Sequence, residues 1–231
     1  IVRDITERVN AAEALAESEE RLDLAIEGGD LGLWDWNLTT GKIYHDERWA
    51  AMLGYELNEI EPSSDAHKQL VHPEDFTLRR DVMLAYLNGT TQKYDSIYRM
   101  KHKNGDWRWI LDRGKIVARN EEGKPLRMVG THFDITEQKN AQESLRSALA
   151  TLNAVLDAVP LPVYSLIKNG CVQIIWNHAA EHILGWSRYE VIGRMLPAIT
   201  DDTKAEDLMY LEWIRECRFF NGTEIQRINK S

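Results

Sequence analysis

The sequence predicts an α+β fold in which a five-stranded antiparallel sheet carries short helices on one face. Three observations lead to this fold class. Two short segments of alternating hydrophobicity are followed by several helical segments and then by three longer alternating segments. The longer segments are joined by turn sequences of hairpin type, which makes neighbouring strands antiparallel. A unit of about 130 residues is also repeated along the chain, which marks it as a domain with its connecting helix.

The complete copy of this unit begins with a helix and two strands. Residues 13–26 place leucine and isoleucine on one helical stripe, and Gly28 with Gly29 ends the helix. Residues 31–38 alternate large apolar and polar side chains, as a half-buried strand does. A turn then leads to a second short strand at residues 42–45.

Helices occupy the middle of the unit. Asp46 is a helix cap and Gly54 a helix stop, and Pro73 stands at the first position of a longer helix with two acidic residues behind it. The predicted helices are residues 47–53, short helices around Ile60 and Leu70, and a longer helix from Pro73 to Leu87.

Three strands close the unit, at residues 93–102, 106–118 and 126–133. Their connections, KNG at 103–105 and RNEEGK at 119–124, are typical of hairpins. Along the middle strand, Arg108, Ile110 and Asp112 share one face of the sheet. Trp107, Trp109 and Leu111 share the other, so we expect both faces to be covered, the outer one by a helix.

The repeat defines the domain organisation. Residues 4–15 and 134–145 are identical at eight of twelve positions, and residues 46–55 match residues 177–186 at nearly the same offset. We therefore expect an exit helix of a preceding repeat at residues 1–20 and a complete domain at 21–136. A connecting helix at 137–152 and a second domain at 153–231 follow. The second domain would need to reach about residue 265 to be complete, so we expect the sequence to be a fragment of a longer protein.

The composition excludes several functions. The chain carries 28 Lys and Arg against 37 Asp and Glu, and nucleic acids or anionic membranes need clustered positive charge, so neither partner is expected. Two cysteines allow at most one disulfide, which favours the reducing cytoplasm. No segment has the ~20 apolar residues of a membrane helix, although the full-length protein could be anchored elsewhere.

The order of elements and several short motifs resemble a PAS domain with its C-terminal PAC motif. The motifs are Gly32–Trp36, Leu53–Tyr55, Val71–Asp75, Trp109–Asp112 and Gly130–Glu137. The resemblance covers residues 21–136 in full and 153–231 in part. It is strongest to the tandem PAS domains of bacterial sensor histidine kinases and cyclic-di-GMP enzymes, and it implies a sensory role.

The connecting helix carries a heptad-like seam. Leu145, Leu149, Leu152 and Leu156 follow a 4-3-4 spacing, which predicts a parallel homodimer. Packing of these leucines on the neighbouring domain is the alternative. In the family that the chain resembles, the junction of Asp134, Ile135, Thr136 and Glu137 would pass a movement of the sheet to this helix.

Three motifs resemble known functional sites without their context. Cys217 lies in a sequence similar to that of flavin-binding light sensors, but its position corresponds to the end of the long helix. His178 and His182 have the spacing of a zinc-protease motif without a third ligand. Residues 27–30 resemble the diguanylate cyclase signature, and a helix stop explains them. The long helix also lacks the axial histidine of haem-binding PAS domains. We therefore expect no metal, haem or flavin.

The resemblance implies a ligand pocket between the inner face of the sheet and the short helices. The pocket candidates are Trp34, Trp36, Met100, Ile110, Met128 and His132. His132 is a polar group on an apolar face and needs a partner, which could be Asp112, a water molecule or a ligand carboxylate. A core filled by side chains, with no ligand, is the alternative.

No residue constellation for catalysis stands at a plausible spacing, so we expect a non-enzymatic module. The predicted function is to sense a small-molecule or redox signal and to transmit it through the connecting helices. The output domain, a kinase or a cyclic-di-GMP enzyme, would lie outside this sequence. The alternative function is a ligand-free dimerisation and spacer module.

Overall fold

The computed structural model describes residues 6–166 and 171–194, and the chain divides into two compact units, residues 1–141 and 142–231. Each unit is described by itself. Helix α5, Thr136–Ala158, begins in the first unit and continues in the second.

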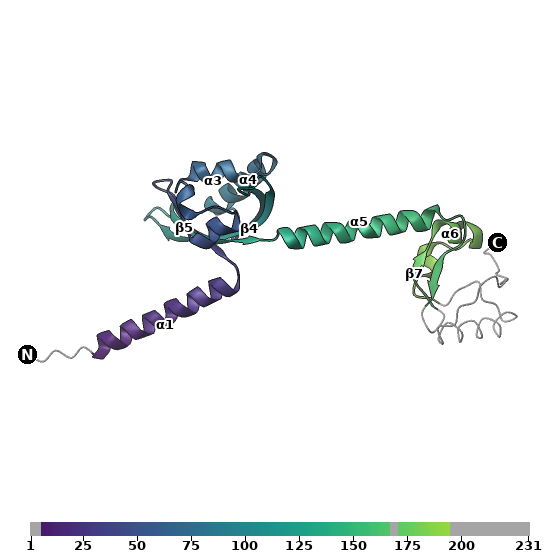
Figure 1. Ribbon diagram of the computed structural model, residues 1–231, viewed down its shortest axis with the longest axis horizontal. Coiled ribbons are helices and arrows are strands. Elements are labelled where there is room, and N and C mark those ends of the chain that lie inside the picture. The colour runs from purple at the N-terminus through teal and green to yellow at the C-terminus, as the bar shows by residue number, and fades with distance from the viewer. Residues whose placement is uncertain (1–5, 167–170, 195–231) are drawn as a thin grey trace, which may run out of the picture. The chain divides into compact units, whose positions relative to one another are not determined.

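The first unit contains the element order that the sequence predicts (Figure 1). Its elements are α1 (Thr6–Gly28), β1 (Gly32–Asn37), β2 (Ile43–His45), α2 (Glu47–Met52), the 3₁₀ helix η1 (Leu57–Glu59), α3 (Ser64–Leu70), α4 (Pro73–Leu87), β3 (Tyr94–Lys101), β4 (Trp107–Arg119) and β5 (Pro125–Asp134). The helix expected around Ile60 ends one residue earlier, because Ile60 adopts an extended conformation as the C-cap of η1.

The five strands form one antiparallel sheet in the order β2-β1-β5-β4-β3, which confirms the predicted fold class. β5 is therefore the central strand, although it is the last of these five strands in the sequence. Figure 1 shows α3 and α4 lying over the sheet. The sheet and these helices enclose the core.

Asp46 links helix α2 to strand β1. Its carboxylate accepts hydrogen bonds from the Trp49 amide at 2.8 Å and from the Leu33 amide at 2.9 Å. One side chain therefore caps α2 and also holds the helix against β1. At the longer helix, Pro73 takes the first position and the His72 side chain accepts from the Glu74 amide.

Ile110 and Asp112 lie on the inner face of the sheet, as the family resemblance implied. Ile110, Met100 and Met128 are all fully buried. The outer face of the sheet is more open than the alternation of residues indicates. In the described part of the chain, Ile97 is 44% exposed and Phe133 is 36% exposed. The helix cover expected over this face is thus incomplete there.

The second unit is described only in part. After α5 it contains β6 (Tyr164–Leu166), β7 (Val172–Trp176), α6 (His178–Leu184) and α7 (Arg188–Val191), and β6 pairs with β7 in antiparallel fashion. The motif around Cys217 lies outside the described residues. Among the helices that the structure does describe, none has the length and hydrophobicity to span a bilayer.

Candidate functional site

A buried carboxylate, Asp112 on β4, is the centre of a polar network inside the first unit. Asp112 is 1% exposed. Its oxygens accept hydrogen bonds from Trp34 Nε1 at 2.9 Å, Tyr94 Oη at 2.6 Å and Tyr98 Oη at 2.8 Å. His132 Nε2 lies 3.2 Å from its Oδ1. These four neighbours match the four acceptor positions of a carboxylate, so Asp112 is saturated by its own protein.

The neutral tautomer of His132 follows from its neighbours. The indole Nε1–H of Trp49 can only donate, and it donates to His132 Nδ1 at 2.7 Å. Nδ1 therefore carries the lone pair and Nε2 carries the proton. That proton faces Asp112 Oδ1 at 3.2 Å and Tyr98 Oη at 3.1 Å. Of the three partners considered from the sequence, Asp112 is the one that the structure provides.

Burial and neighbouring charges set the ionisation of the network. Burial alone would raise the pKa of Asp112, but its interaction with His132, the charge of Arg79 and the hydrogen bond from Tyr94 hold that pKa below the usual value. Burial, assisted by the Asp112 charge, raises the pKa values of Tyr94 and Tyr98 well above normal. The carboxylate is therefore ionised, and both phenols are protonated donors.

A second layer of buried polar side chains lies beside this network. The rings of His45 and His67 are parallel with centroids 5.7 Å apart, and His45 also stacks on Trp49 at 3.7 Å. Arg79 on α4 donates from Nη2 to His67 Nε2 at 3.0 Å. Because the guanidinium only donates, His67 is also a neutral tautomer, with its proton on Nδ1.

The second layer keeps its histidines uncharged. Burial is the main cause that lowers the pKa of His45 to about 3, and electrostatic interaction with the neighbouring His132 adds to it. Burial, followed by the charge of Arg79, lowers the pKa of His67 well below normal. His45 Nε2, His67 Nδ1 and Arg79 Nε are buried without a hydrogen-bond partner in the described part of the chain. The layer can thus accept further polar partners, such as water or a ligand acceptor.

The predicted pocket candidates lie together in this interior. Trp34, Met100, Ile110, Met128 and His132 are all buried. Trp36 is half-buried and packs against the same core. The ring of Trp34 covers the sheet so closely that a Cβ at Gly130 would lie 2.3 Å from it, and one at Gly114 2.6 Å. Side chains therefore fill the inner face at this point, and a ligand-binding role for these residues stays a prediction.

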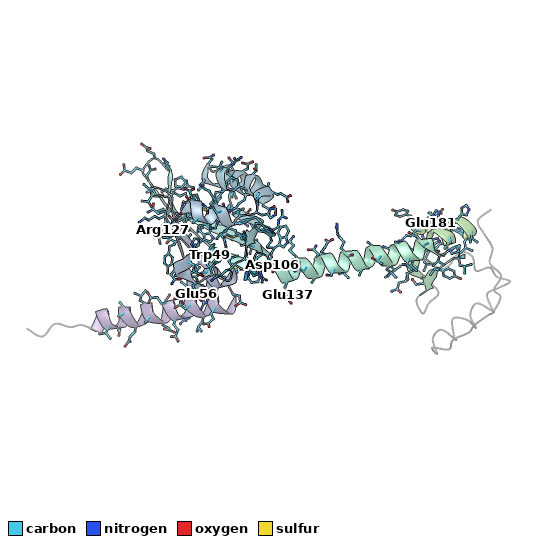
Figure 2. All side chains as sticks on the ribbon, turned by 45° about the horizontal axis from the view of Figure 1, so that its top comes forward. Trp49, Glu56, Asp106, Arg127, Glu137 and Glu181 are labelled. Atoms are coloured by element: carbon cyan, nitrogen blue, oxygen red, sulfur yellow. The ribbon has the colours of Figure 1, made fainter. Side chains whose placement is uncertain are left out.

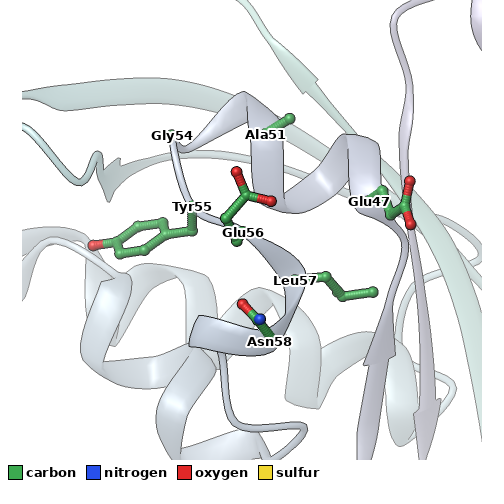
Figure 3. Close-up of a pocket in the computed structure, with 7 residues that line it drawn as sticks. All are labelled: Glu47, Ala51, Gly54, Tyr55, Glu56, Leu57 and Asn58. Carbon is green, nitrogen blue, oxygen red and sulfur yellow. The ribbon is translucent and has the colours of Figure 1, made fainter.

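A surface hollow of about 860 Å³ lies away from these residues. It is formed by α2 and the segment after it, and Figure 3 shows Glu47 and Ala51 on the helix above Tyr55–Asn58. Its lining contains none of the predicted pocket residues. Trp49, by contrast, comes from the same helix but is fully buried.

Sequence reasoning missed most of the polar network. The sequence places Trp49, Tyr94 and Tyr98 in the correct elements but does not indicate that they belong to a site. The same is true of His45, His67 and Arg79. The alternation of Tyr94, Ser96, Tyr98 and Met100 along β3 was the available signal, since all four are buried.

The predicted junction residues connect β4 to α5. Trp109 on β4 donates its amide to Thr136 Oγ1 at 2.8 Å and accepts the Ile135 amide at 2.8 Å. The Asp134 carboxylate accepts the Thr136 amide at 2.7 Å, while Glu137 lies in the first turn of α5 (Figure 2). The start of α5 is therefore held by two hydrogen bonds to a single residue of the sheet, one from the amide and one to the carbonyl of Trp109.

The predicted seam residues lie on an open helix face. Leu145, Leu149 and Leu152 are 62%, 52% and 51% exposed, while Leu156 is half-buried. The spacing that predicts dimerisation is therefore presented on the surface of this single chain. Its occupation by a second copy stays a prediction.

His178 and His182, the pair with zinc-protease spacing, lie on α6 with ring centroids 6.4 Å apart. Within residues 6–166 and 171–194, no group of three or more His, Cys, Asp or Glu side chains is arranged to hold a metal ion.

The five-stranded sheet, its helices and the exit through Asp134 to α5 define a domain of the PAS class. Comparison with known domain families agrees, because residues 42–132 match the PAS fold. A crystal structure of a sensory box histidine kinase/response regulator from Burkholderia thailandensis has 34% sequence identity and a TM-score of 0.51. The match covers 58% of this chain and 98% of that one. The chain thus contains a PAS domain.

Two curated relatives are signalling proteins by name. The sensor protein FixL of Bradyrhizobium diazoefficiens is 26% identical over 179 residues, which is 76% of this chain and 34% of that protein. The probable diguanylate cyclase DgcE of Escherichia coli is 28% identical over 203 residues, which is 86% of this chain and 17% of that protein. The chain spans about a third or less of the length of these relatives.

Proposed function

We propose that the chain is a sensory and regulatory PAS module that passes a small-molecule or redox signal from its first domain to an output domain elsewhere. Relatives named as a sensor protein and as a probable diguanylate cyclase support this role. The module is regulatory and not itself catalytic, and the proposal keeps the cytoplasmic location favoured by the cysteine content.

The observation that carries the proposal is the short path from the buried network to α5. In the antiparallel pairing of β4 and β5, Asp112 is opposite His132, and Ile110 is opposite Asp134. The pair of Asp112 and His132 is thus separated from the junction at Asp134 by only two residues along each strand, which is the distance between neighbouring side chains on one face of a sheet. A change in the hydrogen bonds of Asp112 can shift β4, and Trp109 on β4 is bonded to the first residues of α5.

A second PAS domain beginning near residue 153 is part of the proposal, and local geometry supports it. Asn177 caps α6 as Asp46 caps α2: its Oδ1 accepts from the Ala180 amide at 2.9 Å and from the Val163 amide at 2.8 Å. The helices end at Gly185 and near Gly54, both with positive φ. These equivalences lie at the 130–131-residue offset of the sequence repeat.

Homodimerisation through α5 completes the proposal. Three leucines with heptad-like spacing are more than half exposed on this helix. Exposure of their apolar surface to water is unfavourable, and a partner helix would bury it. The partner would be a second copy of the same chain in parallel orientation.

The spacer role is the second candidate function, and the packing of Trp34 favours it. The indole ring lies against the sheet at Gly114 and Gly130, where an inner-face ligand would compete with it for space. A domain with such a filled interior could set the geometry of a dimer without binding a ligand.

A thermal-shift screen with a metabolite library, followed by hydrogen exchange on the hits, separates the two functions. The sensory function predicts at least one compound that raises Tm and alters exchange in residues 135–145. The spacer function predicts that no compound raises Tm. It also predicts that Trp49→Phe, which removes the donor to His132, leaves exchange in α5 unchanged.

A further inference from the structure

A hollow of about 630 Å³ lies where the chain enters and leaves the PAS domain, and we call it the junction pocket. The end of α1, helix α2 and the junction between β5 and α5 contribute to it. The lining residues used below are Asp30, Arg48, Met52, Arg108, Phe133 and Glu137. Its volume is within the range of small-molecule sites. It shares no residue with the buried network around Asp112.

Both arginines of the junction pocket lack hydrogen bonds from their side chains in the described residues. Arg48 Nη2 is 3.6 Å from Glu27 Oε2, and Arg108 Nη1 is 3.8 Å from Asp134 Oδ2, both too long for a hydrogen bond. Arg108 Nε is also buried without a partner. Two guanidinium groups with free donors, lining one hollow, are suited to a carboxylate or a similar oxyanion.

The acidic residues of the pocket exclude a simple anion. Four carboxylates line it together with the two guanidinium groups, so the pocket has a net negative charge. It would repel a ligand that carries only a negative charge. Asp30 and Glu137 have no ion pair or side-chain hydrogen bond in the part of the chain that the structure describes. They can therefore receive a cationic group.

The apolar lining completes the requirements for a ligand. Met52 is half-buried, and Phe133 is 36% exposed. Both can cover an apolar substituent between the charged groups.

We infer that the junction pocket binds a zwitterion of the amino-acid class with an apolar side chain. The carboxylate meets Arg48 and Arg108, the ammonium meets Asp30 and Glu137, and the side chain lies on Met52 and Phe133. Asp30 lies in the turn between α1 and β1 and Glu137 in the first turn of α5, so an occupied pocket contacts both the entry to the sheet and the exit from it. This second input goes beyond the signal proposed for the interior.

Isothermal titration with L-phenylalanine, phenylacetate and phenethylamine tests the inference, because the two analogues lack the ammonium and the carboxylate respectively. We expect L-phenylalanine, or L-leucine or L-methionine in parallel titrations, to bind at least tenfold more tightly than either analogue. We expect Arg48→Gln and Arg108→Gln each to weaken binding about tenfold. Arg113→Gln is the matched control, because Arg113 lies on the same strand, is exposed, and pairs with Asp95 outside the pocket.

Chemical-shift changes in the unmodified protein provide a readout that needs no variant. L-phenylalanine is expected to shift the amides of Phe133 and Glu137 more than that of Asp112. The inference is overturned if none of the three amino acids binds at millimolar concentration, if phenylacetate binds equally well, or if the shifts cluster around Asp112. A negative result leaves the path from Asp112 to α5 standing, since that path is tested by hydrogen exchange without any ligand.

Discussion

Asp112 shows how one buried carboxylate can organise a domain interior. It accepts hydrogen bonds from two tyrosines and a tryptophan and faces the protonated nitrogen of His132. Because the acceptor positions of Asp112 are filled by these donors, Arg79 Nη2 remains 3.9 Å from Asp112 Oδ2 and donates to His67 Nε2 instead. The charge of the buried arginine is thus balanced by Asp112 without a direct hydrogen bond. A network of this kind specifies one arrangement of β3, β4, β5 and α4.

The neutral histidines predict a loss of stability in acid. The pKa of His45 is about 3 in the folded state and about 6.5 when unfolded, so the unfolded chain binds more protons between these values. Stability is therefore retained above pH 6.5 and falls toward pH 3, by about 1.4 kcal/mol per pH unit for each such group. Denaturant unfolding of His45→Gln should show a slope smaller by this amount. The exposed His178→Gln is the control, and equal slopes in His45→Gln and wild type would contradict the prediction.

The contact between Trp34 and the sheet predicts that Gly130 tolerates no side chain. A Cβ there would lie 2.1 Å from the Arg113 carbonyl oxygen as well as against Trp34. We expect Gly130→Ala to lower the free energy of unfolding by about 3 kcal/mol or more. Gly28→Ala is the control, because a Cβ at Gly28 meets nothing within 4 Å. Chemical denaturation compares the two, and similar stabilities would show that Trp34 packs differently.

Helix α5 is the element that connects the domain to the rest of the protein. Its first turn is fixed by Trp109, whereas its leucine seam is open to solvent. A helix with only two to three heptads dimerises weakly by itself, so the domains at its ends would have to assist.

Leu149→Glu is expected to dissociate a dimer formed through α5, because it buries a charge in the middle of the seam. Native mass spectrometry and light scattering should then give the monomer mass at concentrations where the wild type is dimeric. Leu78→Glu on α4 is the matched control, since Leu78 is 67% exposed but lies outside the seam. A monomeric wild type at high concentration would refute the seam.

At the scale of the whole molecule, local signals predicted the elements well and the site only in part. Caps, glycine stops and hairpin turns depend on neighbouring residues, so the helices and strands of the first unit were expected within a few positions. The buried network joins residues far apart in sequence: Trp34 and Asp112 are separated by 78 positions, and Trp49 and His132 by 83. Alternation also cannot identify the inner face of β4, because the face of Trp107, Trp109 and Leu111 is the more hydrophobic one and the sequence does not show that donors surround Asp112.

The central claim is that the state of the buried network reaches α5 through β4, and hydrogen exchange of Asp112→Asn tests it most directly. The carboxamide cannot accept all four donors, so we predict faster exchange of the amides at residues 135–139 than in the wild type. Asp95→Asn on β3 is the control, as its carboxylate is exposed and accepts from Arg113 on the outside of the sheet, away from the buried network. If Asp112→Asn does not fold, Tyr94→Phe removes one donor and serves the same purpose. Wild-type exchange at residues 135–139, together with altered exchange around residues 112 and 132, would contradict the claim.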